Sequence, residues 1–247
     1  MNLNVFIPQI ENLPYKQKYL KSDLLTASFL IEKKENIEIY YAAHNEYVNR
    51  KARILIVGIT PGWFQMERSI RLTRKLLLQH TAKEELIKEV KRECRFAGSM
   101  RKNLIEMLDV LNLSMYFDID SSADLFNKKD TLLHTVSLIK FPVFVKGKNY
   151  TGHTPQITNS ELFMKYVHQT YETDINPLDA PLIIPLGKAV EQVLQRFVKC
   201  GWIQEQQCLF GFPHPSGANG HRLKQLNHHK AELIKKVQNY NLRYKSK

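Results

Sequence analysis

The strongest constraint on the fold is a set of four short, almost continuous apolar segments, most of which end at a glycine or a proline. They span residues 53–60, 132–141, 181–187 and 208–212. Strands of this length with apolar side chains pointing both ways are typical of a sheet that is buried on both faces. The chain is therefore expected to build its core on four buried strands.

Helical periodicity fills much of the sequence between these segments. Apolar residues recur at helix spacing in 104–111 and in 190–197, and we also expect helices over 15–33, 66–93 and 221–240, with an extended segment at 37–41. Alternating strands and helices predict an α/β fold, a three-layer α/β/α domain with a central, mainly parallel four-stranded sheet. In such sheets a ligand binds outside the carboxyl ends of the strands, at the loops that begin at Thr60, Phe141, Gly187 and Phe212.

The organisation along the chain favours one domain. No internal repeat and no low-complexity linker interrupts residues 1–247. We expect a helical and extended N-terminal segment at 1–52, the sheet core at 53–216 and a basic C-terminal helix at 221–247.

The charge balance favours a polyanionic partner. Thirty-six Lys and Arg residues face 24 Asp and Glu residues, a formal net charge of +12. Such an excess releases counterions from a phosphate backbone, which indicates nucleic acid, although a solvated basic surface is the alternative. One basic cluster lies at 68–102, where acidic residues are interleaved, and another at 222–247, where Glu232 is the single acidic residue.

Other features argue against several classes of protein. Cys94, Cys200 and Cys208 form no CxxC pair, which favours a reducing compartment and disfavours an iron–sulfur cluster. No apolar stretch approaches the roughly 20 residues of a membrane span, and the N-terminus does not resemble a signal peptide. We expect a cytoplasmic, monomeric protein with no membrane contact, no metal and no cofactor.

The loop after the first strand, residues 58–66, has the sequence Gly-Ile-Thr-Pro-Gly-Trp-Phe-Gln-Met. The glycines permit close approach of a ligand, and Phe64 offers a ring on which a base can stack. Capping of the core by Trp63 and Phe64 is the alternative. The loop matches neither the GxxxxGK[ST] nor the GxGxxG phosphate-binding pattern.

The loop after the last strand, residues 212–222, combines two prolines, a serine, two glycines and two histidines. His214 lies between the prolines, and Ser216 follows two residues later. A lone histidine is more often a structural hydrogen-bonding group than a catalyst. The pattern His-Pro-Ser-Gly directly after a buried strand is more specific than a lone histidine.

These two loops carry a resemblance to a known family. Residues 58–62 resemble the first motif of the uracil-DNA glycosylase superfamily, in particular the Gly-(Ile/Met)-Asn-Pro-Gly of its mismatch-specific and single-strand-selective branches. Residues 214–216 resemble the second motif, His-Pro-Ser. Residues 137–142 are similar to the intermediate strand that normally carries a base-reading Asn, and 185–188 to the Leu-Gly that opens the helix after the third strand.

The resemblance implies a DNA N-glycosylase that flips a base out of DNA and hydrolyses its N-glycosidic bond without metal or cofactor. His214 would stabilise charge on the departing base, with Thr60 at the water-positioning place of the first motif. The base pocket would comprise Gly58, Ile59, Pro61, Gly62, Phe64, Ser137 and Asn149. Contacts to DNA would come from Lys188, Ser216, Gly217, Ala218, Asn219 and Arg222.

Two departures from the family pattern leave three interpretations open. Thr60 stands where the family has Asp or Asn, and it cannot act as a base near neutral pH. Ser137 stands where an Asn reads the base edge. The pocket is then reshaped for another or bulkier base such as a modified cytosine, or it is that of a slower uracil glycosylase, or the protein binds or senses DNA without turnover. The biological setting is either repair or defence against foreign DNA, and only the altered pocket residues point to defence.

A basic insert at 143–154, which contains Lys146, Lys148, Asn149, Tyr150 and His153, supports an unusual pocket wall, and a solvated loop is the alternative. A metal hydrolase is disfavoured because His228 and His229 are adjacent on an expected helix and point in different directions. A serine hydrolase is disfavoured because Ser216 lacks the GxSxG pattern.

Overall fold

The computed structural model describes residues 2–96 and 98–245, and these form two compact units. The first unit is assembled from Met1–Val48, Thr60–Ala97 and Ile139–Thr154; the second is assembled from Asn49–Ile59, Gly98–Leu138 and Pro155–Lys247. The units do not coincide with the three segments expected from the sequence, and a single domain remains a prediction. Residues 246 and 247 of the predicted C-terminal helix lie outside the described residues.

The second unit contains the predicted parallel sheet. Its strands are β3 (Ile54–Gly58), β4 (Leu133–Ser137) and β7 (Leu182–Pro185), and they lie in the order β4-β3-β7 with both pairs parallel. All three are buried along nearly their whole length, and β4 buries the polar residues His134 and Thr135 as well as its apolar ones. The α/β fold class is confirmed.

The fourth predicted strand, at 208–212, joins this sheet at one position. Cys208 forms a single parallel bridge with Ile183, and the N–H of Leu209 donates to the carbonyl of Ile183 at 2.9 Å. Gly211 then takes a positive φ of 91°, a conformation that glycine adopts without strain and that ends an extended chain. The described parallel sheet therefore has three strands rather than four.

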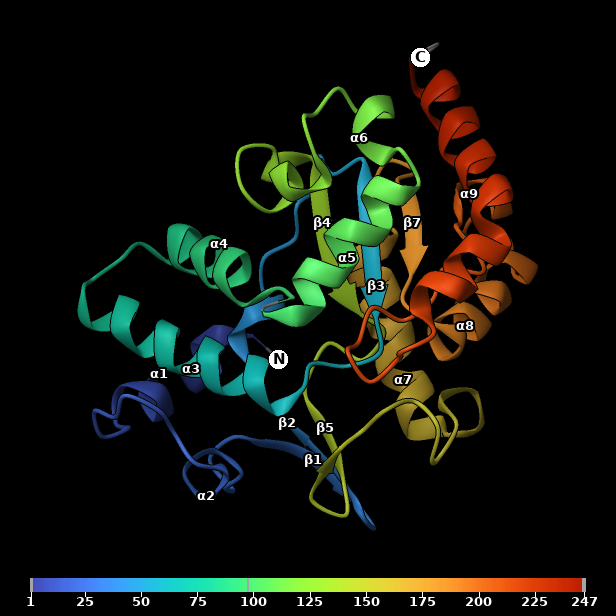
Figure 1. Ribbon diagram of the computed structural model, residues 1–247. Helices are drawn as coiled ribbons and strands as arrows, with labels where there is room; N and C mark the ends of the chain where they lie inside the picture. Colours follow the sequence, from blue (N-terminus) through green and yellow to red (C-terminus); the bar gives the residue numbers. More distant parts are fainter. Residues whose placement is uncertain (1, 97, 246–247) are drawn as a thin grey trace. The chain divides into compact units, whose positions relative to one another are not determined.

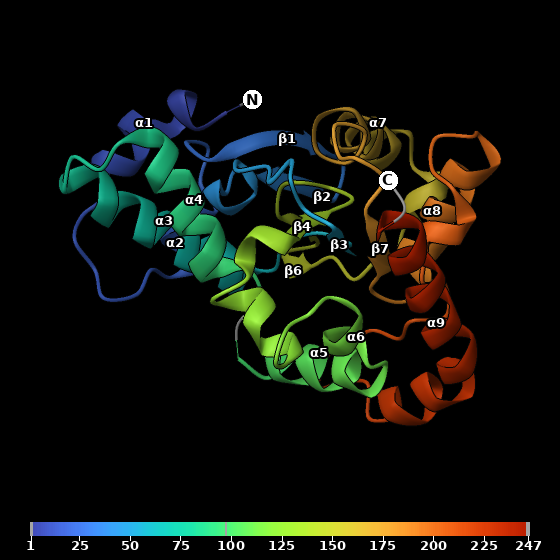
Figure 2. The ribbon, with the colours of Figure 1, turned by 90° about the horizontal axis from the view of Figure 1, so that it is seen from above.

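Helices cover both faces of the sheet (Figures 1 and 2). One side carries α5 (Ser99–Val110), α6 (Leu113–Tyr116) and α9 (Arg222–Lys245). The other side carries α8 (Lys188–Lys199) and α7 (Glu161–Thr170), which continues into a π-helical turn. The apolar residues that predict α5 and α8 are buried, which confirms the predicted helices at 104–111 and 190–197.

The first unit is built on an antiparallel sheet with the strand order β1-β2-β5-β6. Its strands are β1 (Leu30–Lys34), β2 (Ile37–Tyr40), β5 (Val143–Val145) and β6 (Lys148–Asn149). Strand β2 is the extended segment expected at 37–41. The basic insert at 143–154 thus begins as a β-hairpin, whose turn residues Lys146 and Gly147 both have positive φ, as a tight hairpin turn requires.

The helices of the first unit differ from the expectation in two places. The predicted helix at 15–33 is wrong, because only α2 (Lys21–Leu24) is helical there and the following residues pair with β2 as β1. The predicted helix at 66–93 is two helices, α3 (Trp63–Leu78) and α4 (Lys83–Cys94), separated by a turn in which His80 has a φ of 54°. An additional helix, α1 (Leu3–Glu11), opens the chain.

Short 3-10 turns connect the longer elements. They lie at Ala43–Asn45, Ser122–Phe126, Asp130–Leu132, Ile157–Asn159 and Glu205–Gln207, and the π-helical turn spans Tyr171–Ile175.

Candidate functional site

The predicted site residues fall into two groups, one in each unit. Gly58, Ile59 and Ser137 belong to the second unit, together with Lys188, His214, Ser216, Gly217, Ala218, Asn219 and Arg222. Thr60, Pro61, Gly62, Phe64 and Asn149 belong to the first unit.

The carboxyl ends of β3 and β4 bring Gly58 and Ser137 together. The two residues are paired in the parallel register, and a Cβ atom placed on Gly58 would lie 3.7 Å from Ser137 Oγ. The carbonyl of Gly58 accepts the N–H of Leu138 at 2.9 Å. Gly58 thus ends β3 directly beside Ser137, the last residue of β4.

The hydroxyl of Thr60 binds two backbone groups. It donates to the carbonyl of Phe141 at 2.7 Å and accepts the N–H of Val143 at 3.1 Å. Its single proton is therefore engaged by the protein, and one lone pair is left to accept a hydrogen bond from a water molecule. Thr60 holds the start of β5 in place, a role that the sequence pattern does not reveal.

Replacing Thr60 by valine is expected to destabilise the first unit by about 1–3 kcal/mol, because the Phe141 carbonyl and the Val143 N–H lose their shared partner. Thr60→Ser keeps the hydroxyl and is the matched control. Urea unfolding of both variants measures the difference. Equal stability of the two variants would contradict the role assigned to the hydroxyl.

Asn149 caps the helix that follows the first loop. Its Oδ1 accepts the N–H of Trp63 at 3.1 Å, and a Cβ on Gly62 would lie 3.6 Å from its Nδ2. No hydrogen-bond partner of Nδ2 is found among the described residues, so this amide N–H group remains able to donate to a ligand. Phe64, on the first turn of the same helix, is 55% exposed, which suits a ring that stacks on a base. The structure thus brings Asn149, Gly62 and Phe64 together at the start of α3.

Two other residues of the 58–62 segment are less accessible: Ile59 is half-buried and Pro61 is buried. Gly62 donates its N–H to Gln65 Oε1 at 3.2 Å.

His214 has a defined tautomer. Its Nδ1 accepts the backbone N–H of Ser216 at 3.2 Å, so a neutral ring carries its proton on Nε2. Burial lowers the pKa of His214 below the ordinary histidine value, which keeps the ring neutral near pH 7. The side chain is therefore arranged to donate one hydrogen bond from Nε2.

The backbone of the His214 loop is held by side chains around it. Asn103 on α5 is buried, and its Nδ2 donates to the carbonyl of Pro215 at 2.8 Å. Asn219 donates to the carbonyl of His214 at 3.1 Å, and the N–H of Ala218 reaches Ser216 Oγ at 3.2 Å. Asn103 was missed in the sequence, although a polar residue within the apolar stripe of α5 is the signal that marks it.

The predicted DNA contacts differ in exposure. Lys188, Gly217 and Ala218 are exposed, whereas Ser216 and Asn219 are half-buried. Arg222 opens α9, and its Nη2 lies 4.0 Å from Glu106 Oε2. The loop tip and Lys188 are thus accessible to a ligand, and Arg222 lies within ion-pair distance of a carboxylate.

Gly187 makes room for His214. It has a φ of 87°, and a Cβ placed on it would lie 3.1 Å from the Cβ of His214. The glycine is therefore required both by the backbone conformation and by the close approach of the loop.

Gly187→Ala is expected to displace His214 and to destabilise the second unit by about 1–3 kcal/mol through backbone strain. Gly201→Ala is the matched control, because Gly201 has a φ of 73° but no atom within 4 Å of an added Cβ. Unfolding measurements should give similar losses in stability for both variants. A shift in the NMR signal of the His214 ring is expected for Gly187→Ala alone, and its absence would argue against the close approach.

A curated relative places the chain in a family. It is 42% identical over 239 residues to the uncharacterized protein YoxB of Bacillus subtilis (strain 168), a match that covers 96% of this chain and 93% of YoxB. The chain belongs to the YoxB family. No family model matches it.

Among solved structures, the YoxB-family chain is similar to the crystal structure of wild-type SMUG2 from Pedobacter heparinus. The TM-score is 0.46 at 14% sequence identity, over 96% of this chain and 97% of that chain.

Two further observations concern the classes of site that this YoxB-family chain presents. No group of three or more His, Cys, Asp or Glu side chains suited to a metal ion occurs within residues 2–96 and 98–245. In the same described residues no helix has the length and apolar character needed to cross a bilayer.

Proposed function

We propose that this protein is a DNA glycosylase, which flips a base out of DNA and hydrolyses the N-glycosidic bond of that base. The observation that carries the proposal is the arrangement of His214, whose Nδ1 is occupied by the Ser216 N–H within a His-Pro-Ser loop. The Gly-Ile-Thr-Pro-Gly sequence that follows β3, the first strand of the parallel sheet, supports it.

In the proposed reaction, the bond between C1′ of the sugar and the base nitrogen breaks, and its electron pair leaves with the base. The Nε2–H of a neutral His214 donates to the negative charge that develops on the base, as a preorganised donor does in other active sites. Water adds to C1′ of the resulting sugar cation and loses a proton, and the departed base anion takes up a proton from solvent, which leaves a neutral base and an abasic sugar. Thr60 has one lone pair left with which to position that water.

The residues of the proposed pocket favour a base different from the one that an asparagine recognises in the family pattern. Ser137, beside Gly58 at the end of the sheet, is smaller than Asn and leaves more space. In the first unit, the Nδ2 of Asn149 is left able to donate a hydrogen bond to a ligand. A damaged or modified base, of the uracil type or a modified cytosine, is the substrate class we propose, in repair or in defence against foreign DNA.

The experiment is a panel of duplex and single-stranded DNAs that contain uracil, mismatched thymine, hypoxanthine, hydroxymethylcytosine or glucosylated cytosine. After incubation with the protein, alkali cleavage reveals abasic sites. Cleavage of at least one substrate that is lost in His214→Ala supports the proposal, whereas tight binding without an abasic site on any substrate rejects turnover.

A DNA-binding or sensing protein without turnover is the second candidate. The observation that favours it is Thr60, which replaces the acidic or amide residue of the first motif and whose proton is engaged by Phe141. Both candidates predict salt-sensitive DNA binding, so only the abasic-site assay separates them.

A further inference from the structure

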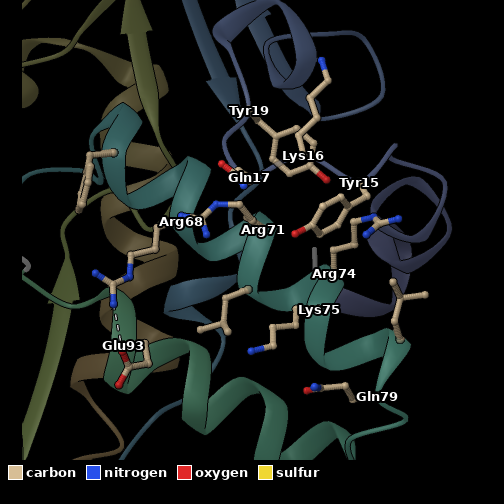
Figure 3. Close-up of a pocket in the computed structure, with 13 residues that line it drawn as sticks. Tyr15, Lys16, Gln17, Tyr19, Arg68, Arg71, Arg74, Lys75, Gln79 and Glu93 are labelled. Carbon is tan, nitrogen blue, oxygen red and sulfur yellow. Dashed lines mark hydrogen bonds and ion pairs between the residues drawn. The ribbon is translucent and has the colours of Figure 1, made fainter.

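The first unit contains a cavity of about 660 Å³ whose lining residues, apart from Phe64, have no role in the proposed reaction. It lies between the N-terminal segment around Tyr15–Tyr19 and one face of α3, with Glu93 of α4 at its edge (Figure 3). Its volume is in the range of ligand sites in proteins.

Basic side chains dominate the lining of this cavity. Arg68, Arg71 and Lys75 lie three and four residues apart, which places them on one face of α3, and Arg74 and Lys16 add two more cations. The single acidic residue of the lining is Glu93. The cavity therefore favours an anionic ligand.

Ion pairs leave part of this charge uncompensated. Three of the five cations have a carboxylate partner: Arg68 with Glu93 at 3.0 Å, Arg71 with Glu67 at 2.7 Å, and Lys16 with Asp23 at 2.8 Å. Arg74 donates its Nε to the carbonyl of Leu13 at 2.8 Å, and no ion-pair partner of Arg74 or Lys75 occurs in the part of the chain that the structure describes. Two adjacent cations, Arg74 and Lys75, are thus available to phosphate oxygens.

Two exposed rings accompany these cations. Tyr15 is 79% exposed and Phe64 is 55% exposed, and both line the cavity. Figure 3 shows Tyr15 beside Arg74. Exposed aromatic rings next to cations are the combination that binds unpaired bases and their phosphates.

The cations are spread along the helix rather than gathered at one point. Arg68 and Lys75 are separated by seven residues, a rise of about 10 Å along α3. One phosphate cannot contact both ends of such a stripe, whereas successive phosphates of a strand can. Phe64 lies one further turn along, at the residue predicted to stack on the flipped base.

We propose that this cavity binds a single DNA strand, with Arg74 and Lys75 on its phosphates and Tyr15 stacked on an unpaired base. The proposal rests on the proposed DNA function, since it adds a second contact surface for the same substrate. A free nucleotide shares the chemistry of phosphate and base, and the experiment separates it from a strand.

The experiment measures binding of an undamaged, fluorescent oligothymidylate by anisotropy over a range of salt concentrations. Arg74→Ala/Lys75→Ala is expected to lower the slope of log K against log[salt] by about 1.4, because each lost contact to a single strand removes about 0.7. Tyr15→Leu is expected to weaken binding about tenfold at constant slope. Lys128→Ala/Lys129→Ala, an adjacent exposed pair outside the cavity, is the charge-matched control and should behave as wild type.

Several results would overturn the proposal. The first is an unchanged salt slope in Arg74→Ala/Lys75→Ala. The second is a decrease of the slope in the Lys128→Ala/Lys129→Ala control that equals the decrease in Arg74→Ala/Lys75→Ala. The third is that Arg74→Ala/Lys75→Ala loses as much affinity for a duplex of the same sequence as for the single strand. Competition by thymidine monophosphate as effective as by the oligonucleotide would assign the cavity to a free nucleotide instead. Because the strand is undamaged, an effect on binding with no excision in the abasic-site panel rejects the glycosylase alone, and excision with unaltered binding rejects the cavity alone.

Discussion

Replacing His214 by alanine is expected to lower the rate of base excision by about 10²–10³-fold, the usual cost of removing one preorganised donor from an active site. The structure supplies the reason, because Nδ1 is occupied by the Ser216 N–H and Nε2 is left to donate. In the His214→Ala variant, the negative charge that develops on the base loses this hydrogen-bond donor. Excision should be measured under single-turnover conditions, so that product release does not mask the chemical step.

Two matched variants make this result specific. His221→Ala removes an exposed imidazole seven residues further along and should retain the wild-type rate. His214→Gln keeps one group able to accept from Ser216 and one able to donate, and it should recover part of the activity. A rate within a fewfold of wild type in His214→Ala, with the protein folded, would contradict the role of His214.

The second large effect is a loss of stability in acid that depends on His44. This residue is 2% exposed in the 3-10 turn Ala43–Asn45, and burial together with the nearby positive charge of Lys91 lowers the pKa of His44 to about 3. Above pH 6.5 the ring is neutral in the folded and in the unfolded chain, and it contributes no pH dependence. Below pH 6.5 the unfolded chain takes up a proton that the folded chain does not, so the free energy of unfolding falls as the pH falls towards 3.

The free energy of unfolding is expected to fall by roughly 5 kcal/mol over the whole window from pH 6.5 to pH 3. His44→Gln removes the titrating group, and its unfolding free energy should fall less steeply between pH 6.5 and pH 4.5, by about 2–3 kcal/mol in total. Urea unfolding at several pH values measures the slope. His221→Gln, at an exposed site, should keep the wild-type slope, and parallel curves for wild type and His44→Gln would refute the assignment.

Local sequence patterns predicted the elements that are rich in apolar residues. The runs that became β3, β4 and β7 and the stripes on α5 and α8 depend only on the order of apolar residues. The helix expected at 15–33 failed because β1 is stabilised by pairing with β2 and, through it, the hairpin at 143–149. Pairing between strands leaves no periodic signal of its own within the short segment that forms β1.

The same distinction separates the parts of the candidate site. The sequence by itself determined the α/β class, the positive charge and the two motifs around Thr60 and His214, because these depend only on composition and on residues close together in the chain. Only the tertiary structure decided that the Thr60 hydroxyl is engaged by Phe141 and Val143, and that Asn103 holds the carbonyl of Pro215. These partners lie more than eighty residues away along the chain. Packing alone determines which of the many polar groups of the chain a buried donor meets.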